Sequence, residues 1–233
     1  MHANNEIGTI QPIAALASLA HDCGALFHTD AVQSAGKIPI DVRSLDVDLL
    51  SISAHKFNGP KGIGALWTRR GAQLRAQLTG GKQERSRRAG TENVPAIAGL
   101  GVAARLAQEK QAESLDYLRT LRDRLEDGIL ANVPGTRRNG EALQRINNTC
   151  NISFDGVEAE SLLIALDLEG IAVSTGSACS SGSLEPSHVL QAMGVRRIEY
   201  RTPFDSVSDS ATRSRRLTTF SHCFLSSSRD SAP

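Results

Sequence analysis

One stretch of the sequence joins an apolar run to a group of polar side chains: VDLLSISAHK at residues 47–56. The run is short and leads into the glycine-rich stretch NGPKG at 58–62, a pattern typical of a strand that ends in a loop. Two similar apolar runs lie on either side of it, ALFHTD at 25–30 and IGALWT at 63–68. Their lengths predict strands that are buried on both faces.

A helix is predicted over 13–21, because helix-forming residues follow Pro12 and Gly24 stands where a helix commonly ends. The helix and the strands together indicate an α/β layer. Beyond Gly90 the pattern changes, and the sequence predicts an α+β part. Its predicted elements are two long amphipathic helices over 94–130, a strand over 149–154, a helix over 158–168 and a strand over 170–174, with loops at Pro134-Gly135 and Asn139-Gly140.

We expect a domain boundary near 90–93. It would separate a large domain over 1–92 from a smaller domain over 93–195. Residues 196–233 are rich in Ser and Arg and show neither a helix period nor a strand period, so they are predicted to form a disordered tail.

The composition excludes several classes of protein. Lys and Arg number 26 against 25 Asp and Glu, a balance that gives no reason to expect a nucleic-acid or membrane-surface binder. The N-terminus has no basic and apolar leader, and no apolar run has the length of a membrane span. Four scattered Cys residues without a CxxC pair argue against a disulfide framework and against a metal site. We therefore expect a soluble protein of the reducing cytoplasm, without a metal.

Asp30 and Lys56 stand at the ends of neighbouring predicted strands. In open α/β sheets, ligands bind beyond the carboxyl ends of the strands. A lysine and an aspartate placed there suit pyridoxal phosphate, because the lysine forms a Schiff base and the carboxylate keeps the pyridinium nitrogen protonated. Two alternatives stay open: a phosphate site made by Gly and Lys without a Schiff base, and ordinary surface charges.

A loop of small residues at 174–186 carries Cys179. An accessible cysteine on such a loop suits a nucleophile that takes up a group and passes it on. A free cysteine is more commonly a small buried hydrophobe, and we expect this of Cys23 and Cys150. For Cys179 both interpretations stay open.

Several longer stretches of the sequence form a recognisable pattern: MHANNEIGTIQP at 1–12, HTDAVQS at 28–34, SAHK at 53–56, QER at 83–85 with RAGTEN at 88–93, and the cysteine loop that continues through SLEPSH at 183–188. With these stretches the chain resembles the NifS-type cysteine desulfurases, which are pyridoxal phosphate enzymes with the class V aminotransferase fold. The resemblance runs from Met1 to about Val195. It implies a fold-type I transferase with a partial large-domain sheet, flanking helices and a smaller α+β domain.

The resemblance implies a role for each matching residue around the cofactor. Lys56 would form the Schiff base and then move the Cα proton of the substrate, and Asp30 would pair with the pyridinium nitrogen. Gln33 and Asn5 would hydrogen-bond the phenolic oxygen, and Asn5 would also lie near the substrate carboxylate.

Further residues are implied for the phosphate and for sulfur. Ser53 and His55 would hold the phosphate, joined by Thr91 from the partner subunit of a homodimer, and His55 is also expected among the catalytic residues. Cys179 would attack the sulfur of L-cysteine, keep it as a persulfide and release L-alanine. The long loop resembles the branch of the family that passes sulfur to iron-sulfur scaffold proteins. The physical argument agrees, because a thiolate that must enter a site and leave it again needs a long loop and not a tight turn.

The sequence departs from the family pattern at both ends. The family segment before the position of Met1 carries a phosphate-binding threonine loop and a histidine that stacks on the cofactor, so we expect a truncated chain. After Val195 the family's carboxylate-binding arginine is replaced. The codons that can encode residues 199–209 can also encode the family's continuation when they are read from the third base of each codon. This match predicts a frameshift in the gene near Arg196. Lys82 stands where the family usually has a glycine.

The expected function is removal of sulfur from L-cysteine with pyridoxal phosphate, for iron-sulfur cluster assembly or another sulfur acceptor. A catalytically inactive fragment is one alternative, because the missing residues position the substrate. A selenocysteine lyase or another class V aminotransferase-type enzyme is a further alternative, against which the long cysteine loop argues.

Overall fold

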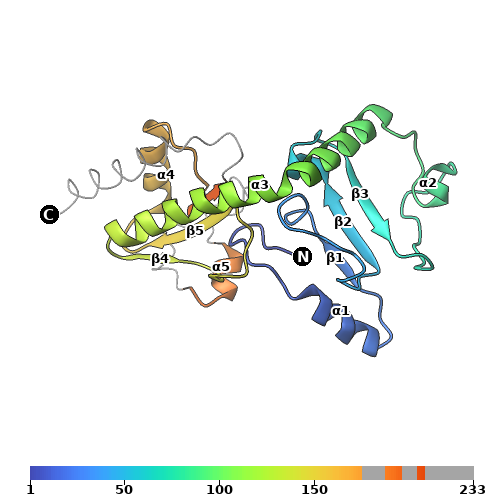
Figure 1. Cartoon of the computed structure of the whole chain (residues 1–233), viewed down its shortest axis with the longest axis horizontal. Coiled ribbons are helices and arrows are strands. Elements are labelled where there is room, and N and C mark those ends of the chain that lie inside the picture. Colours follow the sequence, from blue (N-terminus) through green and yellow to red (C-terminus); the bar gives the residue numbers. More distant parts are fainter. Residues whose placement is uncertain (175–186, 196–203, 208–233) are drawn as a thin grey trace. The chain divides into compact units, whose positions relative to one another are not determined.

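The computed structural model describes residues 1–174, 187–195 and 204–207 (Figure 1). The candidate nucleophile Cys179 and most of the predicted tail lie outside these residues. Among the helices described, none combines the length and the apolar character that crossing a membrane requires.

The chain forms two compact units. Unit 1 joins Met1–Ala3 to Gln11–Gln111, and unit 2 joins Asn4–Ile10 to the chain from Ala112 onward. The units divide within one long helix, whereas the boundary expected near 90–93 lies just before that helix begins. A short segment near the N-terminus therefore belongs with the later part of the chain.

Unit 1 contains a three-stranded sheet. Strand β1 pairs in parallel with β2, with Asp30 opposite Ser51, and β2 pairs antiparallel with β3. The predicted helix and all three predicted strands are thus confirmed, although each strand begins later than expected. The elements are α1 (Ile13–Asp22), β1 (His28–Asp30), β2 (Leu49–Ser53), the 3-10 helix η1 (Ala54–Phe57), β3 (Gly64–Thr68), α2 (Gln83–Ser86) and the first part of α3 (Val94–Asn132).

Helix α1 ends as the sequence predicts. Gly24 follows the C-cap residue Cys23 and has a φ of 71°, a left-handed conformation that favours glycine. Its N–H donates to the His21 carbonyl at 2.8 Å. Ile13 and Ala17, four residues apart, are the buried residues of the helix, so one face of α1 is held in the unit 1 core.

Strand β3 is exposed, so the expectation of burial on both faces is wrong for it. Its side chains Leu66 and Trp67 are 44% and 36% exposed. β3 is an outer strand of its sheet, and in the described part of the chain no element packs over it closely enough to bury these side chains. Leu50 of the central strand is buried against Ile13 and Val47.

Helix α3 is one helix of 39 residues, where the sequence predicted two. The charged stretch in its middle contains neither Pro nor Gly, and therefore nothing breaks the backbone hydrogen bonds. Gly99 has a packing role: a Cβ there would come within 2.5 Å of the Pro60 ring. In unit 1, Ala103 of this helix packs with Ala54 and Phe57.

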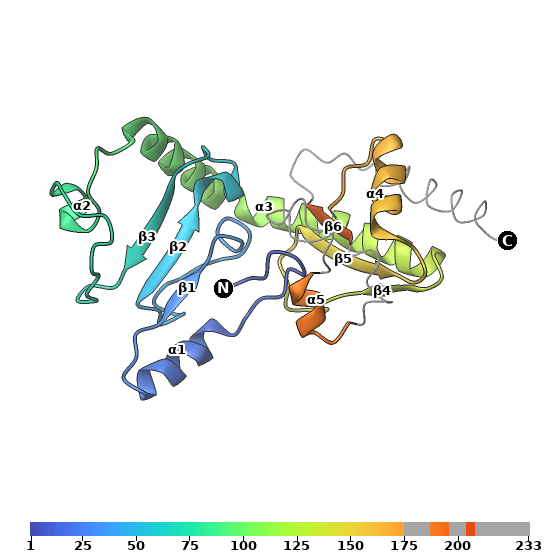
Figure 2. The ribbon, with the colours of Figure 1, turned by 180° about the vertical axis from the view of Figure 1, so that it is seen from behind.

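Unit 2 contains a second three-stranded sheet (Figure 2). Strand β5 lies in its centre and pairs antiparallel with β4 and with β6. Every residue of β5 is buried, and it packs against Leu125 and Ile129 of α3 and Leu162 and Leu166 of α4. The elements are the last part of α3, β4 (Thr136–Arg138), β5 (Thr149–Phe154), α4 (Ala159–Leu168), α5 (His188–Ala192) and β6 (Phe204–Val207).

The sequence predictions for unit 2 have mixed outcomes. β5 and α4 are confirmed, and β4 was not predicted. The strand predicted over 170–174 is wrong, since only Ser174 makes an isolated bridge. Ile171 and Val173 of this segment instead pack as partly buried side chains against the core cluster that contains β5. The expectation of a disordered tail is wrong for the four residues of β6.

Candidate functional site

Asp30 lies at the carboxyl end of β1, where its backbone and side chain are both held. Its carbonyl accepts the N–H of His2 at 2.7 Å, and its Oδ1 accepts the N–H of Val32 at 2.8 Å. Its Oδ2 accepts no hydrogen bond from any described residue. Asp30 thus presents one free carboxylate oxygen at the edge of the sheet.

Lys56 lies in η1, which begins directly after β2. Ala54 and Phe57 of this short helix are buried, whereas His55 is exposed and Lys56 is half-buried. The turn after it requires glycine, because a Cβ on Gly59 would lie 2.8 Å from the Cβ of Ala54. Within the described part of the chain, the Lys56 ammonium makes neither a hydrogen bond nor an ion pair. The amine is therefore available to a ligand.

Ser53 and His55 contact each other at the same edge. The Ser53 Oγ lies 2.9 Å from His55 Nδ1, and both side chains stand at the carboxyl end of β2. Because β1 and β2 are parallel, this end of β2 lies beside Asp30. The pair supplies a hydroxyl and a ring nitrogen, both of which can bind an anion such as a phosphate.

Gln33 follows β1 in the turn that leads away from Asp30. Its Oε1 accepts a hydrogen bond from Lys37 Nζ at 3.1 Å, so its amide NH₂ is the group left to donate. Gln33 is half-buried. Gln33 therefore offers a hydrogen-bond donor in the turn right after Asp30.

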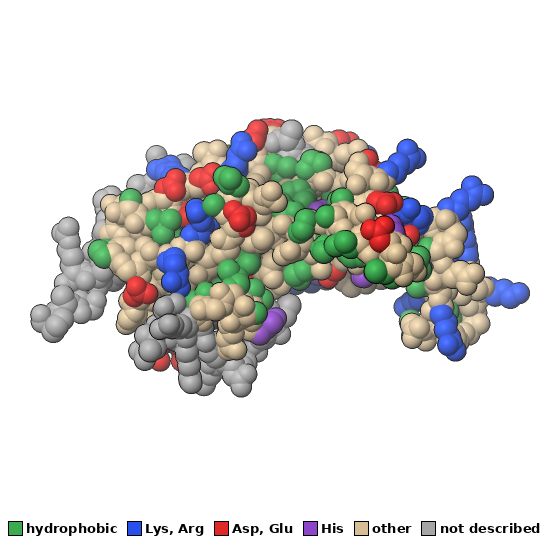
Figure 3. Space-filling model, turned by 90° about the horizontal axis from the view of Figure 1, so that it is seen from below, with side chains coloured by type: hydrophobic (Ala, Val, Ile, Leu, Met, Phe, Trp, Pro, Cys, Tyr) green, Lys and Arg blue, Asp and Glu red, His purple; other side chains and the backbone are tan. Residues whose placement is uncertain are grey.

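Thr91 lies in an exposed loop just before α3. The preceding turn is held by Gln83, whose Oε1 accepts the Gly90 N–H at 3.2 Å. No hydrogen bond in the described part of the chain joins Thr91 to Ser53 or His55. Lys and Arg side chains gather over this segment around α2 (Figure 3). Its exposed basic residues are Arg70, Arg75, Lys82, Arg85, Arg87 and Arg88.

Three predicted site residues fall outside the group at the edge of β1 and β2: Thr91, Asn5 and Cys179. Asn5 belongs to unit 2, where it is half-buried in the segment Asn4–Ile10. Cys179 lies outside the described residues. The structure thus brings together Asp30, Gln33, Ser53, His55 and Lys56 in unit 1.

The opposite end of β2 has a structural cluster of charges. Asp48 is buried, and its Oδ2 accepts from His21 Nε2 and from the Phe27 N–H, each at 2.8 Å, while Arg69 Nε lies 3.2 Å from its Oδ1. Burial acts to raise the pKa of Asp48, but the hydrogen bonds from Phe27 and His21 outweigh it and lower the pKa. The hydrogen bond to Asp48 raises the pKa of His21. This cluster fastens α1 to the sheet.

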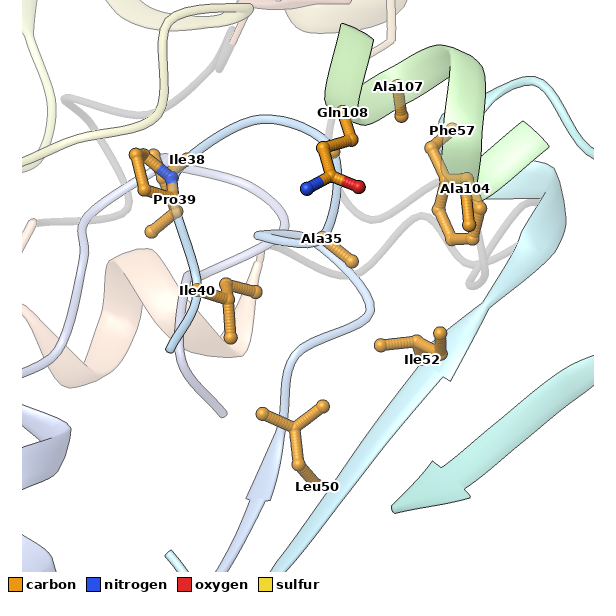
Figure 4. A pocket seen from close by; sticks show the side chains of 11 residues that line it. Ala35, Ile38, Pro39, Ile40, Leu50, Ile52, Phe57, Ala104, Ala107 and Gln108 are labelled. Carbon is orange, nitrogen blue, oxygen red and sulfur yellow. The ribbon is translucent and has the colours of Figure 1, made fainter. Parts of the chain in front are cut away.

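An apolar pocket lies elsewhere in unit 1 and is not the candidate site. Its volume is about 430 Å³, and it is lined by the loop 35–40, by Leu50 and Ile52 of β2, and by residues of η1 and α3. Figure 4 shows Gln108 as the polar side chain among the described residues that line it. With no charged group in its lining, the pocket offers nothing that would bind a phosphate.

Unit 2 buries an ion-pair cluster around Glu126. Arg145 donates to both Glu126 oxygens at 2.6 Å, and Arg138 donates to Oε1 at 2.8 Å. Burial acts to raise the pKa of Glu126, but the hydrogen bonds from Arg145 and Arg138 outweigh it and lower the pKa. The Cys150 thiol donates to Oε2 at 3.4 Å. The sequence did not reveal this cluster.

The two described cysteines differ. Cys150 is 1% exposed, as expected of a buried hydrophobe, and burial together with Glu126 raises the pKa of its thiol well above the usual range. Cys23 is exposed, so the same expectation is wrong for it: it is the C-cap of α1 and points away from the core. Neither residue lies among the site residues of unit 1.

The residues at the edge of β1 and β2 fit pyridoxal phosphate. The free Oδ2 of Asp30 suits a protonated ring nitrogen, and the free amine of Lys56 suits the aldehyde carbon. Ser53 and His55 provide the polar groups that a phosphate needs. These residues thus provide a partner for the ring nitrogen, the aldehyde carbon and the phosphate of the cofactor.

Comparison with known proteins places the chain in a family. The aminotransferase class-V model matches residues 1–201. A cysteine desulfurase from Gluconacetobacter diazotrophicus is 56% identical over 195 residues, which cover 84% of this chain and 49% of that protein. The chain spans about half the length of the curated relatives it matches.

Solved structures agree with that match. A NifS-like protein from Rickettsia africae has a TM-score of 0.87 at 34% identity, over 97% of this chain and 59% of that one. SspA, solved in complex with cysteine, has a TM-score of 0.69 at 36% identity, over 88% of this chain and 56% of that one. The family depends on pyridoxal phosphate. Because the family match extends over most of the chain, this protein belongs to the class V aminotransferases, with their mixed α/β fold.

Proposed function

We propose that the carboxyl edge of β1 and β2 binds pyridoxal phosphate and that this protein removes sulfur from L-cysteine. The observation that carries the proposal is the placement of Asp30 and Lys56. Asp30 is the last residue of β1, Lys56 follows the adjacent parallel strand β2, and each has a functional group without a partner in the described chain. A carboxylate and an amine in this arrangement meet the two chemical requirements of the cofactor ring and its aldehyde.

The residues of unit 1 would act on the substrate in distinct ways. Lys56 holds the cofactor and then takes the proton from the substrate Cα. Asp30 keeps the ring nitrogen protonated, while Ser53 and His55 hold the phosphate. When bound, pyridoxal phosphate supplies an electron sink for the carbanion that forms at Cα. Gln33 binds the phenolic oxygen, a role that the family resemblance also gives to Asn5.

Cys179 would carry the sulfur. Its thiolate attacks the sulfur of L-cysteine, so that an S–S bond forms and the C–S bond of the substrate breaks. The carbon takes up a proton, L-alanine leaves, and the persulfide stays on Cys179. Identity above 50% to cysteine desulfurases and a structural relative solved with cysteine support this choice of substrate.

The proposal extends to partners and location. A homodimer would bring Thr91 of one subunit to the phosphate held by the other, and an iron-sulfur scaffold or another acceptor would take the sulfur. A reducing cytoplasm would keep the thiol active, and the described cysteines Cys23 and Cys150 are both free.

The test measures L-alanine and persulfide in the full chain supplied with pyridoxal phosphate and L-cysteine. Lys56→Ala is expected to lower the rate by a factor of about 100 to 10,000, the usual contribution of a positioned proton carrier. Lys61→Ala, at an exposed lysine in the next loop, serves as the control. Cys179→Ala is expected to form no persulfide, whereas Cys23→Ala matches the unaltered chain.

Two results would contradict the proposal. One is equal alanine formation by the unaltered chain and by Lys56→Ala. The other is an unaltered chain that takes up pyridoxal phosphate on Lys56 and yet releases no alanine, which would indicate an inactive fragment.

A further inference from the structure

His2 lies against the turn that follows β1, and both belong to unit 1. Its backbone N–H donates to the Asp30 carbonyl at 2.7 Å, and its own carbonyl accepts the N–H of Gln11 at 2.8 Å. Only 4% of the residue is exposed. Figures 1 and 2 both show the N-terminus beside β1. The segment Met1–Ala3 is thus held at the end of the strand that carries Asp30.

The His2 ring makes a second contact with the same turn. Its Nδ1 lies 3.1 Å from the hydroxyl of Ser34, a residue that is completely buried. A neutral imidazole has one N–H, so either the ring or the hydroxyl can be the donor of this hydrogen bond. Among the described side chains, His2 is the one that hydrogen-bonds to Ser34. His2 therefore holds the beginning of the turn through its backbone and the end of the turn through its side chain.

The turn between these two contacts carries two of the proposed cofactor ligands. The Oδ1 of Asp30 accepts the Val32 N–H at 2.8 Å, which fixes the rotation of the carboxylate and leaves Oδ2 for a ligand. Gln33 comes next in the turn and stands directly before Ser34. The orientation of Asp30 and Gln33 is therefore set by a short turn that His2 contacts at both of its ends.

We infer that His2 is a positioning residue for the cofactor site, acting through the turn that joins Asp30 to Ser34. Because the turn is held, Asp30 and Gln33 keep one orientation before the cofactor arrives, and the cofactor does not have to order them on binding. His2 itself needs no contact with the cofactor or the substrate. The inference rests on the proposed function, which makes Asp30 and Gln33 ligands of pyridoxal phosphate.

Cofactor binding separates a positioning role from a role in stability alone. A contact that only stabilises unit 1 would lower its urea midpoint and leave the cofactor affinity of the folded chain unchanged. Ordering one mobile side chain on binding costs about twofold to tenfold in affinity, so freeing both Asp30 and Gln33 should cost about fivefold to a hundredfold. The absorbance band of the bound cofactor should shift as well, because it depends on the contacts of the ring nitrogen and the phenolic oxygen.

The experiment titrates the full chain with pyridoxal phosphate. His2→Phe keeps a flat ring without nitrogens, and it is expected to raise the dissociation constant by about fivefold to a hundredfold and to shift the absorbance band. In the cofactor-free chain it should speed hydrogen exchange at the Val32 N–H. His2→Asn should restore much of the affinity, because its amide has a donor and an acceptor for Ser34. Ser34→Ala should match His2→Phe, and joining the two changes should cost little more, because both remove one contact.

His21→Phe is the matched control. His21 also belongs to unit 1 and also bonds through a ring nitrogen to a side chain, Asp48 at 2.8 Å, but it does so at the opposite end of β2. This variant should leave the dissociation constant and the absorbance band unchanged, whatever stability it loses. Equal dissociation constants for His2→Phe and His21→Phe would overturn the inference, as would a His2→Asn chain that binds the cofactor no better than His2→Phe.

Failure of the proposed function and failure of the inference give different results. An unaltered chain that takes up no pyridoxal phosphate on Lys56 overturns the proposed function, and the inference falls with it. An unaltered chain that takes up the cofactor but releases no alanine overturns the removal of sulfur alone. In that case a weaker cofactor affinity of His2→Phe still supports the inference, and an affinity equal to that of the unaltered chain overturns it.

Discussion

The edge of β1 and β2 in unit 1 and the Glu126 cluster in unit 2 treat their charged side chains in opposite ways. In unit 1, the carboxyl edge of β1 and β2 leaves an oxygen of Asp30 and the amine of Lys56 without partners in the described chain. In unit 2, Glu126 is 1% exposed and is hydrogen-bonded by Arg145, Arg138 and Cys150. The first arrangement is suited to a ligand, whereas in the second both oxygens of the Glu126 carboxylate already accept hydrogen bonds from the protein itself.

This difference shows which polar groups are candidates for chemistry. A buried group whose hydrogen bonds are complete contributes to the fold and has nothing left for a substrate. A group at the end of a strand with an unused hydrogen-bond donor or acceptor can still bind a substrate. Lys56 and Asp30 are of the second kind, which is why the proposed function is placed in unit 1.

Removing the Glu126 carboxylate should produce the largest change in stability. Glu126→Ala leaves the 3% exposed side chain of Arg145 charged and without its carboxylate partner, which costs about 3–5 kcal/mol in the free energy of unfolding. Native-state hydrogen exchange of β5 measures the loss. Asp116→Ala removes an exposed ion pair with Arg119 and should cost less than about 1 kcal/mol. Equal losses for the two variants would show that the cluster is not a structural ion pair.

Thiol labelling sharpens the same comparison. In the folded chain at pH 8, iodoacetamide should modify the exposed Cys23 and leave Cys150 unmodified, because burial and Glu126 raise the pKa of the Cys150 thiol well above its usual range. Both should react once urea unfolds the chain. Peptide mapping reads the result, and rapid modification of Cys150 before unfolding would contradict a closed unit 2 core.

The pH dependence of unit 1 should be a smaller effect. The hydrogen bond to Asp48 raises the pKa of His21 in the folded state, so the protonated histidine stabilises unit 1 below its unfolded pKa of about 6.5. This contribution disappears as the pH rises through the folded pKa. His21→Gln should therefore flatten the decline in urea midpoint between about pH 6 and pH 8, followed by Trp67 fluorescence in unit 1. A urea midpoint that depends on pH equally in His21→Gln and in the unaltered chain would contradict this role of His21.

Local patterns predicted that Asp30 and Lys56 stand at the ends of neighbouring strands, whereas the roles of Gln33, Ser53 and His55 followed only from the family resemblance. The strand that ends at Ser53, just before Lys56, could be predicted because an apolar run and a glycine-rich turn lie next to each other in the sequence. β4 could not, because Thr136–Arg138 has no apolar alternation and is a strand only through its pairing with β5. The continuity of α3 was not predicted either, although the middle of the helix contains neither Pro nor Gly.

Contacts across long sequence separations were not predictable. Glu126 and Arg145 lie far apart in the sequence, and Glu6 and Ser187 lie almost at opposite ends of the described chain. Ser187 offered one local signal, since a serine just before a helical stretch is a common N-cap. Its partner Glu6 could not be predicted, because the packing of Ile7 against Leu190 brings the two segments together only in the folded chain.

The most direct test of the account is to locate the lysine that binds pyridoxal phosphate. The full chain is mixed with the cofactor, reduced with borohydride and mapped by mass spectrometry. The account predicts one dominant modified residue, Lys56, whose labelling falls when Asp30 is changed to Ala and is unaffected by Lys61→Ala. Labelling spread over exposed lysines such as Lys61 and Lys82, with Lys56 unmodified, would contradict it.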